Sequence, residues 1–164
     1  MKPDSRFQSW FDWLMKWEGT TFENDPDDPG GATKFGIDQR SHPNEKIRDL
    51  TRERAAEIYW SEYWTKCRAH EMPAKLGEVV ANIAVNAGHS RAARWLQQAS
   101  GITVDGVIGP ATMHAVEGHN AILLAKAMLD RTEEHYRTIA KGKLAKFLKG
   151  WLNRNNDLRK FVGL

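Results

Sequence analysis

The sequence predicts a mainly α-helical fold with one small β-hairpin. Apolar residues recur at helical spacing along most of the chain, and only residues 24–37 combine prolines and glycines in a way that indicates a hairpin. With 164 residues, 41% of them hydrophobic, the chain can bury one sizeable core. No tandem repeat or low-complexity linker interrupts it. A single domain over residues 1–164 is therefore expected.

The first helix is expected over residues 5–18. Ser5 and Gln8 fit a capping box at its start, and Gly19 supplies a stop after Glu18. Aromatic and aliphatic side chains fall on one face of this helix: Phe7, Trp10, Phe11, Leu14 and Trp17. Glu18 is thus expected in the last helical turn.

The remaining helices follow from the same spacing. One starts near Thr51. Another, which Pro73 opens and Gly88 ends, has the cleanest amphipathic stripe and is expected to be the central core helix. Shorter helices are expected over residues 92–99, 110–116, 122–139 and 144–152. The hairpin segment lies between the first two helices.

Charge is unevenly distributed, although the formal net charge is only +3. Between residues 137 and 160, eight basic residues accompany a single acid, Asp157. Such a segment could meet an anionic membrane, lipopolysaccharide or another anionic polymer, and a merely solvated basic face fits equally well. Nucleic acid is not expected as a partner, because no recognised binding motif accompanies the charge.

Glu18 is the first candidate for chemistry. The last turn of a helix presents unpaired carbonyls and the negative end of the dipole, so a carboxylate is unfavourable there. Trp17 and Phe22 suggest apolar surroundings as well. Both effects disfavour the charged form, and the sequence therefore predicts a carboxyl group able to act as a general acid. The alternative is a surface glutamate at a frayed helix end.

An acidic, glycine-rich segment follows, from Asn24 to Ile37, and contains Asp25, Asp27 and Asp28. Its prolines and adjacent glycines would hold carboxylates and the Thr33 hydroxyl close to the helix end. Hydrolysis of a glycosidic bond needs such a pair: one acid to protonate the leaving oxygen, and a second group to stabilise the cation or orient a water. A calcium loop is the competing interpretation, but the prolines interrupt its alternate-residue ligand pattern.

Several motifs together resemble a known family. They are Glu18-Gly19 with residues 24–37, Ile58-Tyr59-Trp60-x-x-Tyr63-Trp64, Asn86-Ala87-Gly88, Leu96-Gln97, Asp105-Gly106-x-Ile108-Gly109-Pro110-x-Thr112 and residues 150–154. This set is similar to glycoside hydrolase family 108, the phage and bacterial N-acetylmuramidases with a Glu-Gly-Gly-Tyr hallmark. The resemblance implies that Glu18 is the catalytic acid and that residues from about 75 onward form a predicted peptidoglycan-binding region. Thr20-Thr21-Phe22 replaces the second half of the hallmark.

The spacing Glu18-x8-Asp27-x5-Thr33 is also similar to that of T4-type phage lysozymes, in which three such side chains line the cleft. The resemblance implies a lysozyme-like fold in which the hairpin lies next to the catalytic helix. It also implies that Asp27 is the electrostatic or water-positioning carboxylate and Thr33 its helper. Because the turn after Glu18 departs from the hallmark, Asp25 or Asp28 could take that role instead.

Other side chains are candidates for substrate binding. Tyr59 and Tyr63, with Trp60 and Trp64 beside them, could stack on sugar rings, but aromatic clusters at helical spacing are more often core. Asn82 and Asn86 lie one turn apart on the central helix and could reach N-acetyl groups or satisfy buried backbone. The six histidines show no metal-ligand pairing, and no serine or cysteine triad is evident. No metal and no cofactor is therefore expected.

The sequence thus indicates a monomeric peptidoglycan hydrolase that cleaves the β-1,4 bond between N-acetylmuramic acid and N-acetylglucosamine. Residues 1–72 would carry catalysis and residues 73–164 the helical region. The first residues run into an amphipathic pattern, which favours synthesis in a host cytoplasm without a signal peptide, release through a membrane pore and action in the periplasm, as a phage endolysin does. The alternatives are a non-catalytic peptidoglycan-binding accessory protein and another cell-wall or chitin-type glycosidase.

Overall fold

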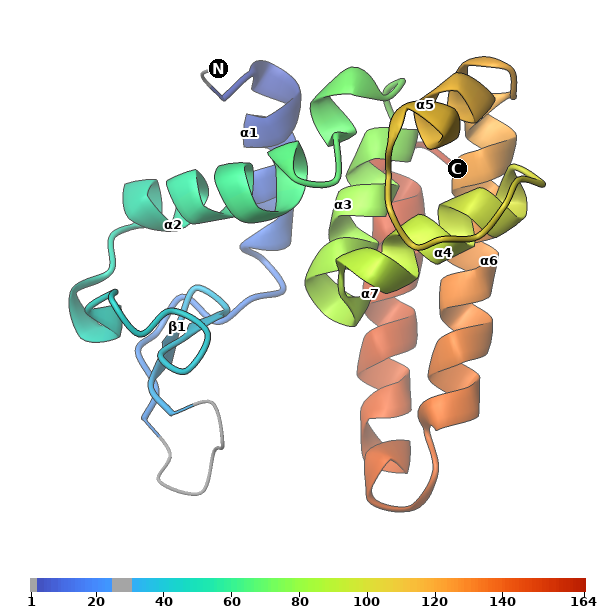
Figure 1. Ribbon diagram of the computed structural model, residues 1–164. Coiled ribbons are helices and arrows are strands. Elements are labelled where there is room, and N and C mark those ends of the chain that lie inside the picture. The colour runs from blue at the N-terminus through green and yellow to red at the C-terminus, as the bar shows by residue number, and fades with distance from the viewer. Residues whose placement is uncertain (1–2, 25–30) are drawn as a thin grey trace. The chain divides into compact units, whose positions relative to one another are not determined.

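The computed structural model describes residues 3–24 and 31–164 and is mainly helical (Figure 1), which confirms the predicted fold class. Its contacts divide the chain into two compact units, residues 1–62 and residues 63–164. The predicted single domain over residues 1–164, with its parts at 1–72 and 73–164, stays a prediction. In the described part of the chain, no helix combines the length and the apolar character needed to cross a membrane.

Helix α1 (Ser5–Leu14) opens the first unit and buries its apolar face. The predicted cap at Ser5 is wrong, because the Asp4 carboxylate, one residue earlier, accepts the hydrogen bond from the Phe7 N–H at 2.8 Å. The predicted helix end at residue 18 is also wrong. After Leu14 the chain tightens, with the Trp17 N–H bonded to the Leu14 carbonyl three residues back. The Glu18 N–H bonds to the same carbonyl at 3.1 Å, so the last turn is irregular but still coiled.

The predicted hairpin is present. Strands β1 (Thr33–Lys34) and β2 (Ile37–Asp38) pair antiparallel, with Thr33 opposite Asp38. Phe35 and Gly36 connect them with φ angles of 55° and 72°. Positive φ at both central residues defines the turn type whose twist matches that of paired strands. An isolated bridge between Glu23 and Thr33 adds the segment after α1 to the edge of this small sheet.

The 3-10 turn η1 (Ile47–Asp49) leads to helix α2 (Arg52–Tyr59), which starts where the sequence predicts, because the Thr51 hydroxyl caps the Arg54 N–H. The chain then continues as a π-helical segment, η2 (Trp60–Thr65). In Figure 1, α1 and α2 cross each other. Their aromatic rings form the core of this unit, and the rings of Phe11 and Tyr59 lie 5.7 Å apart.

Helix α3 (Leu76–Ala87) is the central helix of the second unit, as predicted, since every residue from 76 to 84 is buried. It follows the 3-10 turn η3 (Ala69–Glu71) and begins three residues after Pro73. The delay arises at Lys75, whose φ of 76° is incompatible with a helix. Gly88, with φ of 89°, ends α3 and directly precedes the next helix.

The other helices of this unit are α4 (His89–Ala99), α5 (Pro110–Glu117), α6 (Ala121–Ile139) and α7 (Leu148–Phe161), with the 3-10 segment η4 (Gly142–Phe147) between the last two. The helix predicted over residues 144–152 is therefore shifted: its first residues are 3-10 and α7 extends to Phe161. Helices α6 and α7 lie side by side and are joined by η4 (Figure 1). The Asn155 side chain donates to the Leu129 carbonyl at 3.1 Å and fastens the pair.

Candidate active site

Glu18 lies four residues after the end of α1, in the irregular turn that follows the helix, and is half-buried. Its carboxylate lies against the hairpin turn. A Cβ atom built on Gly36 would be 2.6 Å from the Glu18 Oε2 atom and 2.9 Å from its Cδ. The backbone of the turn therefore forms one wall of the site that holds this carboxylate.

Gly36 is required in this turn for two independent reasons. Its φ of +72° lies in the left-handed region, which is unfavourable for residues with a side chain. A Cβ atom at this position would also lie closer to the Glu18 carboxylate than the shortest distances found for real Cβ atoms. The close approach between the turn and the carboxylate is thus possible only with glycine.

Tyr59, the last residue of α2, reaches the same turn. Its hydroxyl donates to the Phe35 carbonyl at 2.9 Å and lies 2.7 Å from the position that a Cβ on Gly36 would occupy. Its ring is only 1% exposed and packs against Phe11. The burial of this ring supports a role in the core and not in stacking on sugars. The hydroxyl, in contrast, lies next to Gly36, as the Glu18 carboxylate does.

Thr33 lies in the middle of the small sheet, with Glu23 on one side and Asp38 on the other. Directly paired residues project to the same face of a sheet, so two carboxylates flank the Thr33 side chain. The Thr33 hydroxyl donates to the Gly31 carbonyl at 3.3 Å. Glu23 and Asp38 are not recognisable as site residues in the sequence, because strand pairing alone brings them beside Thr33.

The Asp38 carboxylate has a structural partner. Burial raises its pKa, but a hydrogen bond from the Ser41 N–H, at 2.9 Å, and further hydrogen bonds outweigh that effect, and the pKa is lowered overall. Asp38 therefore stays ionised and fastens the turn after β2. Asp25, Asp27 and Asp28, the candidates for the second catalytic carboxylate, lie outside the described residues.

The other candidates belong to the second unit. Tyr63 is half-buried, and its ring stacks on the His89 ring at 5.4 Å. Asn82 is 2% exposed and accepts a hydrogen bond from the Arg154 guanidinium at 3.4 Å. Asn86 is exposed and interacts with the Tyr136 side chain. Both asparagines thus have partners within the helical unit.

Nucleophilic chemistry at Cys67 is disfavoured. Burial raises the pKa of its thiol to about 12, and the thiol donates to the Tyr63 carbonyl at 2.7 Å. A thiol of this kind is not available as a thiolate at neutral pH. Among residues 3–24 and 31–164, no group of three histidine, cysteine or acidic side chains is arranged to hold a metal ion.

A glutamate after the first helix, held against a glycine turn of a small hairpin in an otherwise helical fold, defines a lysozyme-like glycoside hydrolase. Residues 11–88 match the family described as glycosyl hydrolase 108, and residues 91–156 match the predicted peptidoglycan domain. The chain therefore contains a segment that matches glycosyl hydrolase 108, followed by a predicted peptidoglycan domain, which confirms the resemblance found in the sequence.

The chain is also similar to a solved structure, that of Brucella abortus SagA. The TM-score is 0.81 and the identity 29%, and the match covers 95% of this chain and 92% of that one. No curated protein sequence matches this chain significantly. The glycosyl hydrolase and peptidoglycan domains together support a peptidoglycan hydrolase.

Proposed function

We propose that the protein is an N-acetylmuramidase that cleaves the β-1,4 bond between N-acetylmuramic acid and N-acetylglucosamine. One observation carries the proposal: the Glu18 carboxylate is fixed against Gly36 and close to the Tyr59 hydroxyl, within the segment that matches glycosyl hydrolase 108. The predicted peptidoglycan domain that follows supports peptidoglycan as the polymer.

In this mechanism Glu18 donates its proton to the bridging oxygen as the glycosidic bond breaks. The positive charge that develops on the sugar is stabilised by a carboxylate of the 25–28 segment, which we assign to Asp27. A water positioned by Asp27 and Thr33 then attacks the anomeric carbon, and the proton that this water releases replaces, through exchange with solvent, the one that Glu18 donated. The hydrogen bond between the Tyr59 hydroxyl and the Phe35 carbonyl fixes the turn against which Glu18 lies.

The test is Glu18→Gln on purified sacculi. We expect clearing to fall at least 100-fold while sedimentation with sacculi is retained, because only the proton donor is lost. Glu53→Gln, at an exposed position of α2, is the matched control and should clear normally. Mass spectrometry must find reducing N-acetylmuramic acid ends in the released fragments. Reducing N-acetylglucosamine ends would identify a different glycosidase. Equal clearing by the two variants would exclude Glu18 as the proton donor, and sedimentation with sacculi without clearing by any form would favour the non-catalytic binding protein.

We further propose that the protein acts as a phage endolysin, made in the host cytoplasm and released through a membrane pore to the wall. Expression in a Gram-negative host tests this. Lysis should follow only when a pore-forming protein is co-expressed, and the Glu18→Gln form should not lyse under the same conditions. Lysis without a pore would overturn the proposed route of release.

Anionic membrane or lipopolysaccharide is a proposed additional partner of the basic segment. The η4 tip exposes Leu144 (44%) and Phe147 (45%) among exposed lysines: Lys141, Lys143, Lys146 and Lys149. Apolar side chains among cations are typical of surfaces that bind an anionic interface. Neutralising Lys143, Lys146 and Lys149 to glutamine should abolish binding to phosphatidylglycerol vesicles. Neutralising the exposed residues Lys16, Lys46 and Lys126, an equal change in charge, should not. Equal binding by both variants would contradict the proposal.

A further inference from the structure

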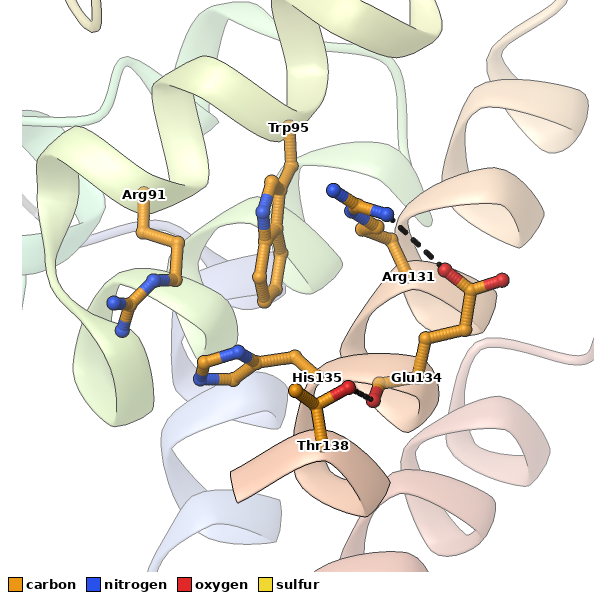
Figure 2. Close-up of a pocket in the computed structure, with 6 residues that line it drawn as sticks. All are labelled: Arg91, Trp95, Arg131, Glu134, His135 and Thr138. Atoms are coloured by element: carbon orange, nitrogen blue, oxygen red, sulfur yellow. Dashed lines mark hydrogen bonds and ion pairs between the residues drawn. The ribbon is translucent and has the colours of Figure 1, made fainter.

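A pocket of about 260 Å³ lies between α4 and α6 in the second unit (Figure 2). Its lining is Arg91 and Trp95 from α4 with Arg131, Glu134, His135 and Thr138 from α6. Two further hollows adjoin it and share Trp95, one toward Arg94 and the other toward Ala127. We call the first of these three the α4–α6 pocket.

Positive charge prevails in the α4–α6 pocket. Arg131 is paired with Glu134 at 3.2 Å, as Figure 2 shows. Arg91 donates to the Ala87 carbonyl at 3.3 Å, and no carboxylate in the described part of the chain forms an ion pair with it. Two guanidinium groups therefore accompany one carboxylate, and the charge of Arg91 is uncompensated.

Trp95 and His135 form the rigid part of the wall. Their rings meet edge to face at 5.3 Å, and Trp95 is only 8% exposed. Burial, followed by the charges of Arg91 and Arg131, lowers the pKa of His135, so its imidazole is neutral at neutral pH. The pocket thus presents guanidinium donors beside a fixed aromatic edge.

The chemistry of the ligand follows from these features. A sugar-binding site would offer an exposed aromatic face for stacking, and the Trp95 ring does not offer one. A guanidinium that forms no ion pair, as at Arg91, instead suits a carboxylate, which a guanidinium can bind with two parallel hydrogen bonds. The volume is below the roughly 300–1,000 Å³ of sites for drug-sized ligands, and therefore suits a group of amino-acid size.

We propose that the α4–α6 pocket binds a free carboxylate of the peptide stem of peptidoglycan, with Arg91 as the main anchor. The inference rests on peptidoglycan as the partner in the proposed function. Within that polymer the sugars offer mainly hydroxyl and acetamide groups, whereas the stem peptides carry the carboxylates. The second unit would then recognise peptide-bearing strands in preference to bare glycan.

The test uses the full-length Glu18→Gln protein, so that binding is measured without hydrolysis. A synthetic tripeptide stem, L-Ala-γ-D-Glu-diaminopimelic acid, is titrated while NMR follows the Trp95 indole and the His135 ring. We expect saturable shifts of both signals, at least tenfold weaker binding after Arg91→Gln, and no loss after Arg137→Gln. Arg137 is the control because it is an arginine of α6 that lies outside the pocket lining and pairs with Glu133 at 2.8 Å.

The same stem with its carboxylates amidated provides the second arm. Equal binding of the free and amidated stems, or unchanged binding after Arg91→Gln in a protein that folds normally by circular dichroism, would overturn the carboxylate site. Absence of any shift would do the same. Clearing of sacculi by the wild-type protein is measured separately. A failure of the pocket to bind the stem carboxylate is therefore distinguishable from a failure of the proposed muramidase activity.

Discussion

The carboxylate of Glu18 occupies the space that a side chain at Gly36 would need. A Cβ there would lie 2.6 Å from Glu18 Oε2 and 2.7 Å from the Tyr59 hydroxyl. Three segments that are distant in the sequence, the turn after α1, the hairpin turn and the end of α2, therefore meet at one backbone position. The position of the Glu18 carboxylate, the proposed acid, therefore depends on residue 36 having no Cβ atom.

Gly36→Ala should accordingly impair activity more than stability. The left-handed φ costs about 1–2 kcal/mol for a residue with a side chain, and the collision must in addition displace the Glu18 carboxylate. We expect clearing of sacculi to fall at least tenfold in protein that remains folded. Gly101→Ala separates the two effects, since Gly101 also has a positive φ, +66°, but nothing lies within 4 Å of its Cβ position. Equal loss of activity in both variants would argue against the collision.

Tyr59→Phe tests the anchor of the same turn. The variant keeps the buried ring but leaves the Phe35 carbonyl without its hydroxyl donor. An unsatisfied buried acceptor costs about 1–3 kcal/mol, so the midpoint of urea unfolding should fall. The activity of the folded fraction should fall as well, because the turn that holds Glu18 loses its fixation. Unchanged activity with lowered stability would restrict Tyr59 to a structural role.

The sequence predicts the helices well because their apolar stripes are local and periodic. It places Glu18 near a glycine-rich turn, but not the contact itself, since the approach to Gly36 joins residues 18 positions apart. The Ser5 cap fails because Asp4 offers the same chemistry one residue earlier, and local preference does not choose between them. Lys75 delays α3 through a left-handed backbone angle that composition does not reveal.

Site residues that depend on long-range packing were beyond the sequence. Tyr59 belongs to an aromatic stripe and is buried, but the destination of its hydroxyl, 24 residues away at Phe35, depends on tertiary structure. Arg91 and Arg131 are likewise ordinary surface cations in the sequence. Only the packing of α4 on α6 places both around Trp95.

The motifs around Gln97 and Asp105 form a single hydrogen-bond network. The Gln97 amide, 1% exposed, donates to Asp105 Oδ1 at 2.6 Å and to the Val107 carbonyl at 2.9 Å, while its oxygen accepts from the Gly106 N–H at 2.9 Å. Both ends of one side chain are therefore satisfied by the Asp-Gly turn. This part of the family resemblance has a structural explanation.

Gln97→Glu should destabilise the protein by about 1–3 kcal/mol, because the Val107 carbonyl and the buried Thr112 hydroxyl lose the amide that donates to them and the new carboxylate faces Asp105. The hydrogen bond from Gln97, followed by that from the Val107 N–H, lowers the pKa of Asp105. In the native protein, the stability that ionised Asp105 contributes is present above the unfolded pKa of about 3.9 and is lost as pH falls through the folded pKa. Urea unfolding at pH 7 and pH 3 should therefore find a smaller deficit for the variant at pH 3. A deficit independent of pH would exclude repulsion as its cause.

His135 makes the electrostatics of the α4–α6 pocket measurable. Arg91 faces it from α4, and Arg131 and Glu134 face it from α6. Burial and then the two arginines lower its pKa. Because the folded pKa is depressed, the unfolded chain binds more protons in the window below about pH 6.5, and stability falls as pH drops from there toward the folded pKa.

Arg91→Gln removes one of the two cations and should raise the pKa of His135 toward its usual range, whereas Arg137→Gln should leave it in place. A bound stem carboxylate should also raise the pKa of His135, since an opposite charge favours the imidazolium. NMR titration of the His135 ring measures all three cases. If His135 titrates at the same pH in the wild type and in Arg91→Gln, then Arg91 does not set the potential of the pocket, and its assignment as the anion anchor loses its electrostatic basis.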